Sequence, residues 1–425
     1  MISATSRTPF ALIVGLLMML IGLEQALAMP VFARKYDMSC AACHSAFPRL
    51  NEFGEQFAAQ NMRLSNWKDA ATSNNGDERL ALPDSVPLAL RAQGFAQLRD
   101  DAEGTDSNEE TYNNTGDFQS PYLIKLLTSA PLSEHITFYG YGIMAEKGDN
   151  GGFLVEDAWF SHDDVFGSGV AMMLGQFQVS DLMFPRETRL TFQDFMLYRM
   201  AGITYDRGII VDRGLGPVEL AVGAVNGNGV TANATISSPG YKRADHLFDN
   251  DNSKSVFARL GTEIGGVGIG LFGLTGSERF DGDADLAGAN DWVSDKRIAG
   301  VDLSGSIGPK LHWFFQGLVN EWDDVIVQDE TYTWDGLFLG IDYIHSPRWA
   351  FSALYNRTDS GDLEGSNTVY NGIDMDSITL GASYYFMTNV KGVMEVNYDL
   401  LDTDEENYGH NGTDSYFLLG FDAAF

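Results

Sequence analysis

The chain has 425 residues, 44% of them hydrophobic and 20% charged, which is long enough to bury a large core. Its 27 Lys and Arg stand against 59 Asp and Glu, and the formal net charge of −32 excludes a nucleic-acid-binding protein. The chain has only 2 cysteines, and both fall in one short motif, so a disulfide framework is not expected.

Residues 1–28 are predicted to be a secretory signal peptide. Arg7 supplies the positive start, residues 10–23 form an apolar run too short for a membrane helix, and Ala26-Leu27-Ala28 is an A-x-A cleavage site. An uncleaved anchor is the competing interpretation, and Glu24, which closes the apolar run, argues against it. The mature chain is therefore expected outside the cytoplasm.

A C-x-x-C-H motif follows at Cys40, Cys43 and His44. Two thiols at this spacing attach one haem covalently, and the next histidine binds the haem iron as proximal ligand. A thioredoxin-type pair would need a βαβ context, and a zinc site would need two more ligands nearby. The motif predicts one covalent haem c, with Cys40 and Cys43 as thioether residues and His44 as the iron ligand.

Residues 29–65 are predicted to form a short α-helical monohaem cytochrome c segment. Pro48 can open a helix on which Leu50, Phe53 and Phe57 share one face. About forty residues seldom make a stable core unaided. The rest of the chain is therefore expected to supply the remaining walls of the haem site.

The ligand opposite His44 is predicted less directly. Met62 is the best-placed thioether, while Met38 lies too near Cys40, and an open or water-bound position is the alternative. The later histidines are interpreted as ordinary polar residues rather than ligands: His135, His162, His246, His312, His345 and His410.

After a linker at residues 66–85, residues 86–425 are predicted to form a transmembrane β-barrel. This part has no second haem motif, no long amphipathic helix and no apolar stretch of membrane-helix length. Apolar residues instead alternate with period two, as in Leu337-Phe338-Leu339-Gly340-Ile341, which is typical of a barrel strand with one face on lipid. Sixteen such segments can be counted, an even number, as bacterial single-chain barrels require. They span residues 88–99, 120–129, 134–146, 152–162, 169–178, 195–206, 216–226, 253–264, 266–276, 296–306, 309–320, 333–345, 348–357, 374–387, 388–398 and 414–425.

The connections alternate between long and short, with short ones at Ser133, Gly265, Gly308, Ser346-Pro347 and Asn389. Long external loops and short periplasmic turns are the pattern of bacterial outer-membrane barrels. The last segment is amphipathic and ends in an aromatic residue, since Phe417, Leu419, Phe421 and Phe425 share one face.

Acidic residues gather in the long connections, for example at 100–110, 281–295, 321–330 and 402–406. They could form an entrance that concentrates cations or an ordinary solvated rim. The segment from Asp181 to Arg189 is less acidic than the other long connections. It could fold inward as a constriction, with Arg186 and Arg189 facing the cytochrome segment, or form a plain external loop.

The sequence Ala28-Met29-Pro30-Val31-Phe32-Ala33-Arg34, followed by the haem motif, resembles the signature of the fused monohaem cytochrome–porins. These outer-membrane proteins serve iron-oxidising bacteria as the iron(II) oxidase. Phe47-Pro48-x-Leu50-Asn51-x-Phe53-Gly54 also resembles the stretch that follows their haem motif. The chain departs from the iron oxidases at Lys35-Tyr36-Asp37, where they continue with Gln-Thr-Gly. The resemblance therefore supports the architecture more specifically than the substrate.

The sequence thus predicts a mainly β protein, a barrel of about 16 strands with a short cytochrome c plug in its lumen or at its periplasmic mouth. The resemblance implies oxidation of extracellular Fe(II), with the electron passed to a periplasmic c-type cytochrome or cupredoxin. The chain would then be an iron(II):cytochrome c oxidoreductase, and no separate catalytic side chain is predicted. Two alternatives remain: a diffusion porin with a haem-bearing gate or redox sensor, and a haem peroxidase.

Overall fold

A computed structural model describes most of the chain after residue 30. The described residues are 31–64, 76–79, 88–99, 103–105, 111–113, 116–144, 153–227, 252–279, 293–324, 329–363, 374–387, 389–401 and 415–425. The predicted signal peptide, nearly all of the predicted linker at 66–85, and most of the acidic loop residues lie outside this set. No helix in the described part of the chain is long and apolar enough to cross a membrane.

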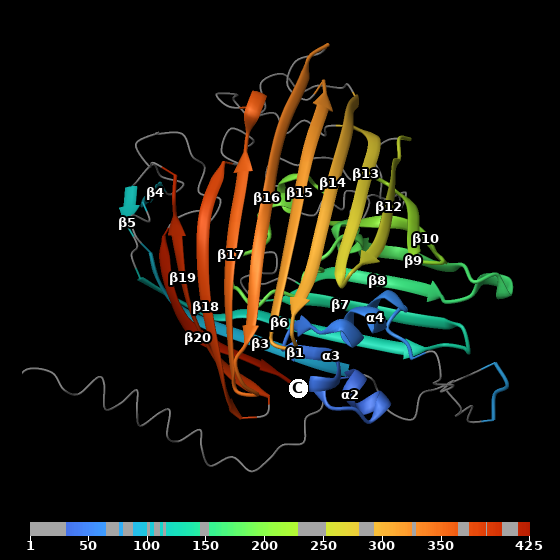
Figure 1. Cartoon of the computed structure of the whole chain (residues 1–425), viewed down its shortest axis with the longest axis horizontal. Helices are drawn as coiled ribbons and strands as arrows, with labels where there is room; N and C mark the ends of the chain where they lie inside the picture. The colour runs from blue at the N-terminus through green and yellow to red at the C-terminus, as the bar shows by residue number, and fades with distance from the viewer. Residues whose placement is uncertain are drawn as a thin grey trace, which may run out of the picture.

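Sixteen antiparallel strands close into one barrel (Figure 1). Each strand pairs with its sequence neighbours, and the last strand pairs with the first through Phe421 opposite Gly94, so the sheet has no free edge. The strands are β3 (Leu88–Arg99), β6 (Gly116–Pro131), β7 (Ile136–Met144), β8 (Leu154–His162), β9 (Ala171–Gln178), β10 (Tyr205–Leu215), β11 (Val218–Val225), β12 (Ser255–Ile264), β13 (Val267–Arg279), β14 (Val293–Ile307), β15 (Leu311–Asp323), β16 (Thr331–Ile344), β17 (Trp349–Asp359), β18 (Met375–Met387), β19 (Val390–Asp399) and β20 (Tyr416–Ala424).

The two faces of the strands follow the predicted alternation. On β16, Leu339, Ile341 and Tyr343 are exposed on the outside of the barrel, whereas Phe338 and Asp342 in the alternate register are buried. On β20, Phe417, Leu419 and Phe421 are exposed in the same way. The period-two pattern therefore separated the outer apolar face from the lumen correctly.

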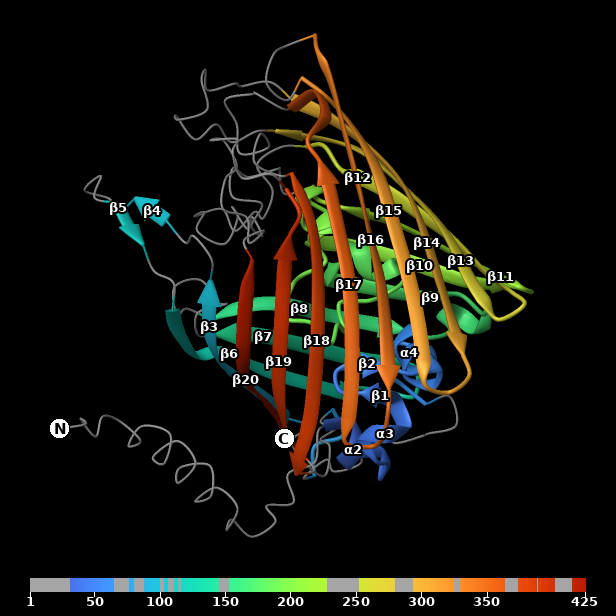
Figure 2. The ribbon, with the colours of Figure 1, turned by 60° about the vertical axis from the view of Figure 1, so that its left-hand side comes forward.

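The two ends of the barrel differ in their connections. Short turns join the strands at the end that carries the C-terminus, including turns at Gly216, Gly265 and Gly308 (Figure 2). These three glycines have φ values of 71°, 62° and 62°, a left-handed conformation that favours glycine in a tight turn. Longer connections lie at the opposite end, one of them containing the small hairpin of β4 (Glu103–Thr105) and β5 (Thr111–Asn113).

The predicted strand at residues 195–206 is wrong. This stretch contains the short helix α5 (Met196–Met200), and the strand begins only at Tyr205. Phe195 and Leu197 alternate as in a strand, but Tyr198 and Met200 are buried as well, so apolar residues occupy both registers. The true strand was missed because charged residues interrupt its alternation.

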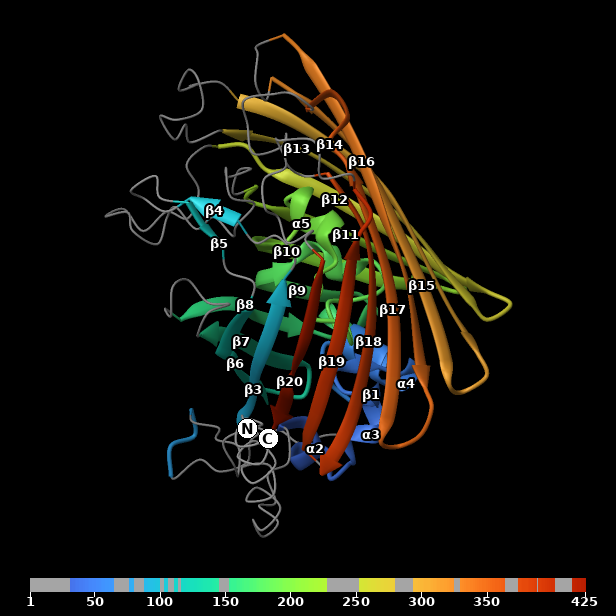
Figure 3. The same cartoon turned by 90° about the vertical axis from the view of Figure 1, so that its left-hand side faces the viewer.

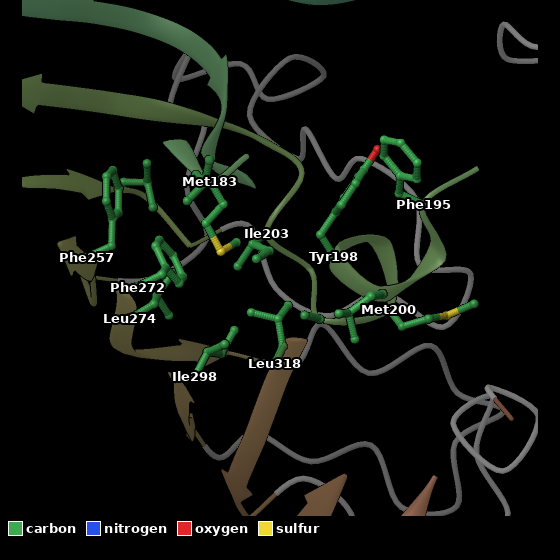
Figure 4. Close-up of a cluster of buried hydrophobic side chains, with 14 of the residues drawn as sticks. Met183, Phe195, Tyr198, Met200, Ile203, Phe257, Phe272, Leu274, Ile298 and Leu318 are labelled. Atoms are coloured by element: carbon green, nitrogen blue, oxygen red, sulfur yellow. The ribbon is translucent and has the colours of Figure 1, made fainter. Parts of the chain in front are cut away.

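Residues 179–204, which join β9 to β10, fold into the lumen (Figure 3). We call them the inward loop; it contains η4 (Val179–Leu182) and α5. Its buried residues Met183 and Ile203 lie among the wall residues Phe257, Phe272, Leu274, Ile298 and Leu318 (Figure 4). Phe195, also from this loop, stacks on Phe338 of β16 with ring centroids 4.5 Å apart. Of the two interpretations of the segment from Asp181 to Arg189, the inward constriction is confirmed.

The N-terminal segment, residues 31–64, lies at the short-turn end of the barrel, where the C-terminus also lies (Figure 1). It contains α2 (Val31–Tyr36), α3 (Cys40–Cys43), α4 (Glu52–Ala59) and the short strands β1 (His44–Ala46) and β2 (Arg49–Leu50). The predicted helix opening at Pro48 is wrong, because Asn51 caps the helix and it begins at Glu52. Phe57 is buried as expected, but Phe53 is 41% exposed.

Candidate functional site

The C-x-x-C-H motif forms one helical turn followed by an extended residue. Cys40 and Cys43 are the ends of α3, so their side chains lie one turn apart, and both thiols are free. Burial raises the pKa of each thiol, which keeps both protonated at neutral pH. The motif therefore presents two neutral, unpaired thiols on one side of the turn.

His44 is oriented by the backbone that follows it. Its Nδ1 lies 2.9 Å from the carbonyl oxygen of Pro48, which can only accept, so Nδ1 carries the proton and Nε2 keeps its lone pair. Burial lowers the pKa of His44 to about 4, and the Pro48 carbonyl opposes this shift. A neutral imidazole with its Nδ1–H bound to a carbonyl is the arrangement of a metal-ligating histidine.

Helix α4 packs directly on the cysteine turn, and two residues allow it to do so. A Cβ on Gly54 would lie 2.1 Å from the carbonyl oxygen of Cys43, so only glycine permits this approach. The Asn51 side chain accepts a hydrogen bond from Gly54 N–H and donates another to the carbonyl of Ala42, at 2.9 Å each. The cap of α4 thus fixes the helix to the motif.

Met62 follows α4 and turns back towards the motif. Its N–H donates to the carbonyl of Phe57 at 3.0 Å, and its own carbonyl accepts a 3.4 Å hydrogen bond from the Tyr36 hydroxyl. Tyr36 also packs edge-on against Phe57, with ring centroids 5.6 Å apart. Tyr36 therefore holds the backbone of Met62 in place.

A single cavity of ≈ 590 Å³ brings the predicted site residues together. Cys40, Cys43, His44 and Met62 all line it from the N-terminal segment, and Met38 does so as well. The barrel wall supplies the other side with Leu127, Tyr139, Trp159, Met173 and Ile210. This volume lies within the range of roughly 300–1,000 Å³ that is typical of cofactor sites, and such sites are largely apolar.

Side chains of the barrel wall hydrogen-bond to the backbone of Phe47, the residue that precedes Pro48. Phe47 N–H donates to the Tyr385 hydroxyl at 2.8 Å, and its carbonyl accepts from Lys391 Nζ at 2.6 Å. The Phe47 ring packs edge-on against the His44 ring, at 5.2 Å between centroids, and lies 5.2 Å from the Arg91 guanidinium. Two strands that lie more than 300 residues from the motif therefore fix the backbone that orients His44.

Two further ion pairs join the N-terminal segment to its surroundings. Arg49, only 2% exposed, pairs with Asp342 of β16 at 2.8 Å and stacks on Phe314 of the wall. Glu55 of α4 pairs with Arg186 of the inward loop at 3.5 Å. Arg186 thus faces the N-terminal segment as predicted, whereas Arg189 pairs within the loop with Glu187 and Asp194.

Three histidines of the barrel have ordinary polar partners, and the ring of His345 lies against Tyr343 and Phe351. His135 pairs with Asp163 at 2.7 Å, His162 accepts from Asp164 N–H, and His312 contacts Ser306 at 2.8 Å. His246 and His410 lie outside the described residues.

Sequence reasoning missed the wall residues Lys391, Tyr385, Arg91 and Asp422. Asp422 accepts from Arg91 at 2.7 Å and lies 3.6 Å from Lys391. A charged residue in the lumen register of a predicted strand was the available signal, since Lys391 and Asp422 interrupt otherwise apolar segments. The contacts of Lys391, Tyr385 and Arg91 with Phe47 depend on closure of the barrel, which local sequence patterns do not encode.

No family model matches the sequence, and no curated protein matches it. The fold is similar to solved porins. OmpF of Salmonella typhi, in complex with daunomycin, aligns with a TM-score of 0.51 and 15% identity over 80% of this chain and 97% of the porin. The anion-selective porin of Comamonas acidovorans aligns with a TM-score of 0.51 and 13% identity over 80% of this chain and 99% of the porin. The chain therefore has the fold of a porin-type outer-membrane β-barrel.

Proposed function

We propose that this protein is an outer-membrane c-type cytochrome–porin fusion that carries electrons across the outer membrane. The observation that supports this most directly is the convergence of Cys40, Cys43, His44 and Met62 on one cavity between the N-terminal segment and the barrel. The free thiols, the unprotonated Nε2 of His44 and the cavity volume all fit a covalent haem.

Cys40 and Cys43 would hold haem c by thioether bonds, His44 would bind its iron, and Met62 is the candidate for the opposite side. When bound, haem c supplies a one-electron redox couple. Leu127, Trp159 and the other apolar wall residues line one side of the cavity, and the Pro48 carbonyl holds the His44 ring in place.

The difference between the two ends of the barrel supports one direction for the proposed electron transfer. The N-terminal segment lies at the short-turn end, which in bacterial barrels faces the periplasm. A periplasmic c-type cytochrome or cupredoxin would collect the electron there. The donor would enter from the opposite, loop-bearing end. The resemblance to fused cytochrome–porins supports extracellular Fe(II) as this donor, and the protein would then be an iron(II):cytochrome c oxidoreductase.

The test is to express the chain in a host that matures haem c and to mix its outer membranes anaerobically with Fe(II). We expect prompt reduction of the haem, followed in its absorption bands. A variant with Cys40→Ser and Cys43→Ser serves as the control without covalent haem. Haem that dithionite reduces but Fe(II) does not would remove the iron-oxidase assignment and leave the fold untouched.

A diffusion porin with a haem-bearing gate is the second candidate, favoured by the likeness of the barrel to solute-conducting porins. It predicts solute-dependent conductance in planar bilayers that changes with the redox state of the haem.

A further inference from the structure

Four carboxylates converge in the lumen beside the cavity that Cys40, Cys43 and His44 line. Glu156 and Asp157 come from β8, and Asp181 and Glu187 from the inward loop. We call these four residues the lumenal carboxylates. Asp157, Asp181 and Glu187 line the cavity itself.

A β-bulge places two adjacent carboxylates on the same face. The pairing of β7 with β8 runs regularly to Tyr141 opposite Asp157, and then shifts so that Gly142 faces Val155, which leaves Glu156 as the extra residue. Adjacent strand residues normally point to opposite faces, yet Glu156 and Asp157 are both buried, 7% and 9% exposed. Bulges of this kind re-aim side chains at functional sites.

Glu156 and Glu187 are brought close together by one phenol. The Tyr205 hydroxyl lies 3.4 Å from Oε2 of Glu156 and 3.4 Å from Oε2 of Glu187. The Tyr141 hydroxyl in turn contacts the Tyr205 hydroxyl. A strand of the wall and the inward loop therefore contribute to the same polar group.

Asp157 has no partner of its own among the described residues. The structure gives it neither a hydrogen bond nor an ion pair, although its side chain is nine-tenths buried and lines the cavity. Ionising a carboxyl group in such a place without a positive partner is costly, and a bound cation would offset that cost. Asp157 thus points to an occupant that the protein side chains do not provide.

The charges around this group do not balance. Six carboxyl groups meet four cationic side chains: Glu55, Glu156, Asp157, Asp181, Glu187 and Asp194 against Arg49, Lys125, Arg186 and Arg189. A buried excess of negative charge favours a cation in the same space. Carboxylates and phenols are oxygen ligands, which suit hard divalent cations.

We propose that the lumenal carboxylates bind a divalent cation of the hard, oxygen-preferring class beside the cavity of the C-x-x-C-H motif. No three acidic, His or Cys side chains in the described chain are placed to chelate a bare ion, so the cation is held with part of its water shell. If the proposed function holds, this cation is Fe(II) on its way to the haem; the binding site itself does not depend on that function.

Mn(II) is a suitable probe, because it is a hard divalent cation whose free form is counted by electron paramagnetic resonance. Holoprotein in detergent is titrated with Mn(II) as the wild type and as Asp157→Asn, Asp181→Asn and Asp329→Asn. The last removes an exposed rim carboxylate and is the matched control. We expect one Mn(II) site whose affinity falls roughly 10–100-fold in Asp157→Asn and Asp181→Asn and is unchanged in Asp329→Asn.

The proposal is overturned if the wild type binds no Mn(II), if both lumenal variants bind as the wild type does, or if Asp329→Asn loses as much affinity. Asp181 lies on the inward loop, so its variant remains a test should the change in β8 prevent barrel formation. If Mn(II) binds as predicted but Fe(II) does not reduce the haem, the cation site is supported and Fe(II) is not the electron donor. If Fe(II) reduces the haem but Mn(II) does not bind, the cation site is wrong and Fe(II) remains the proposed donor.

Discussion

The ammonium group of Lys391 donates a 2.6 Å hydrogen bond to the backbone carbonyl of Phe47, three residues after His44. Lys391 is 3% exposed and also lies 3.6 Å from Asp422. The next carbonyl, that of Pro48, accepts from His44. A charge on the barrel wall is therefore connected to the predicted iron ligand through two adjacent peptide groups.

Lys391→Met is expected to lower the reduction potential of the haem, because a buried positive charge near the iron favours the reduced form. We expect a decrease on the order of 60 mV, equivalent to a tenfold change in the one-electron equilibrium constant. Redox titration measures it. Tyr385→Phe, which removes an acceptor from Phe47 N–H without a change in charge, should shift the potential less; an equal shift in both variants would contradict the electrostatic explanation.

Substitution of the two thiols and substitution of Met62 are expected to have different effects on the haem. The pair of changes Cys40→Ser and Cys43→Ser should abolish haem that survives denaturing electrophoresis, because no thioether can form. Met62→Leu should keep the covalent haem but change the ligation seen in its absorption spectrum and lower its potential. An unchanged spectrum in Met62→Leu would assign the position opposite His44 to another group or to water.

Gly54→Ala should reduce the yield of haem-loaded protein sharply. The added Cβ would lie 2.1 Å from the carbonyl oxygen of Cys43, so α4 must move away from the cysteine turn. The yield is read as covalent haem per folded barrel. Ala58→Gly, on the same helix, is the control for lost helix propensity, which costs about 1 kcal/mol. Equal yields in the two variants would show that α4 does not need this contact.

Glu395→Ala should loosen the inward loop. The Glu395 carboxylate accepts from Phe192 N–H at 2.6 Å, Gln193 N–H at 3.0 Å and the Tyr416 hydroxyl at 2.6 Å. The Tyr416 hydroxyl keeps the Gln193 side chain as a partner. Each of the two backbone donors that loses the carboxylate costs about 1–3 kcal/mol, so we expect higher single-channel conductance in planar bilayers. Glu395→Gln, which keeps an acceptor oxygen, should change it less. Unaltered conductance in Glu395→Ala would mean that apolar packing alone holds the loop.

The barrel could be predicted from the sequence because strand alternation is local. Leu339 and Ile341 on one face, and Phe338 and Asp342 on the other, are separated by period two alone. The motif at Cys40, Cys43 and His44 is equally local, since its spacing is dictated by the chemistry of attachment. These are the parts of the fold and site that needed no long-range information.

The inward loop was harder to predict for a physical reason. Phe195 and Leu197 pack inside the lumen, where a short helix buries apolar residues on several sides. The hydrophobic pattern of this segment therefore has no period-two alternation that would distinguish a strand from a loop. The hydrogen bond between Lys391 and the Phe47 carbonyl joins residues separated by 344 positions. Such contacts follow from barrel closure, and no local pattern carries them.

The most direct test of the account uses proteoliposomes that enclose an oxidised soluble c-type cytochrome and receive Fe(II) from outside under anaerobic conditions. We predict that the enclosed cytochrome is reduced with the wild-type protein and not with the variant carrying Cys40→Ser and Cys43→Ser, which keeps the barrel and lacks covalent haem. Equal rates with both proteins would contradict the account, because Fe(II) would then be diffusing through an ordinary pore.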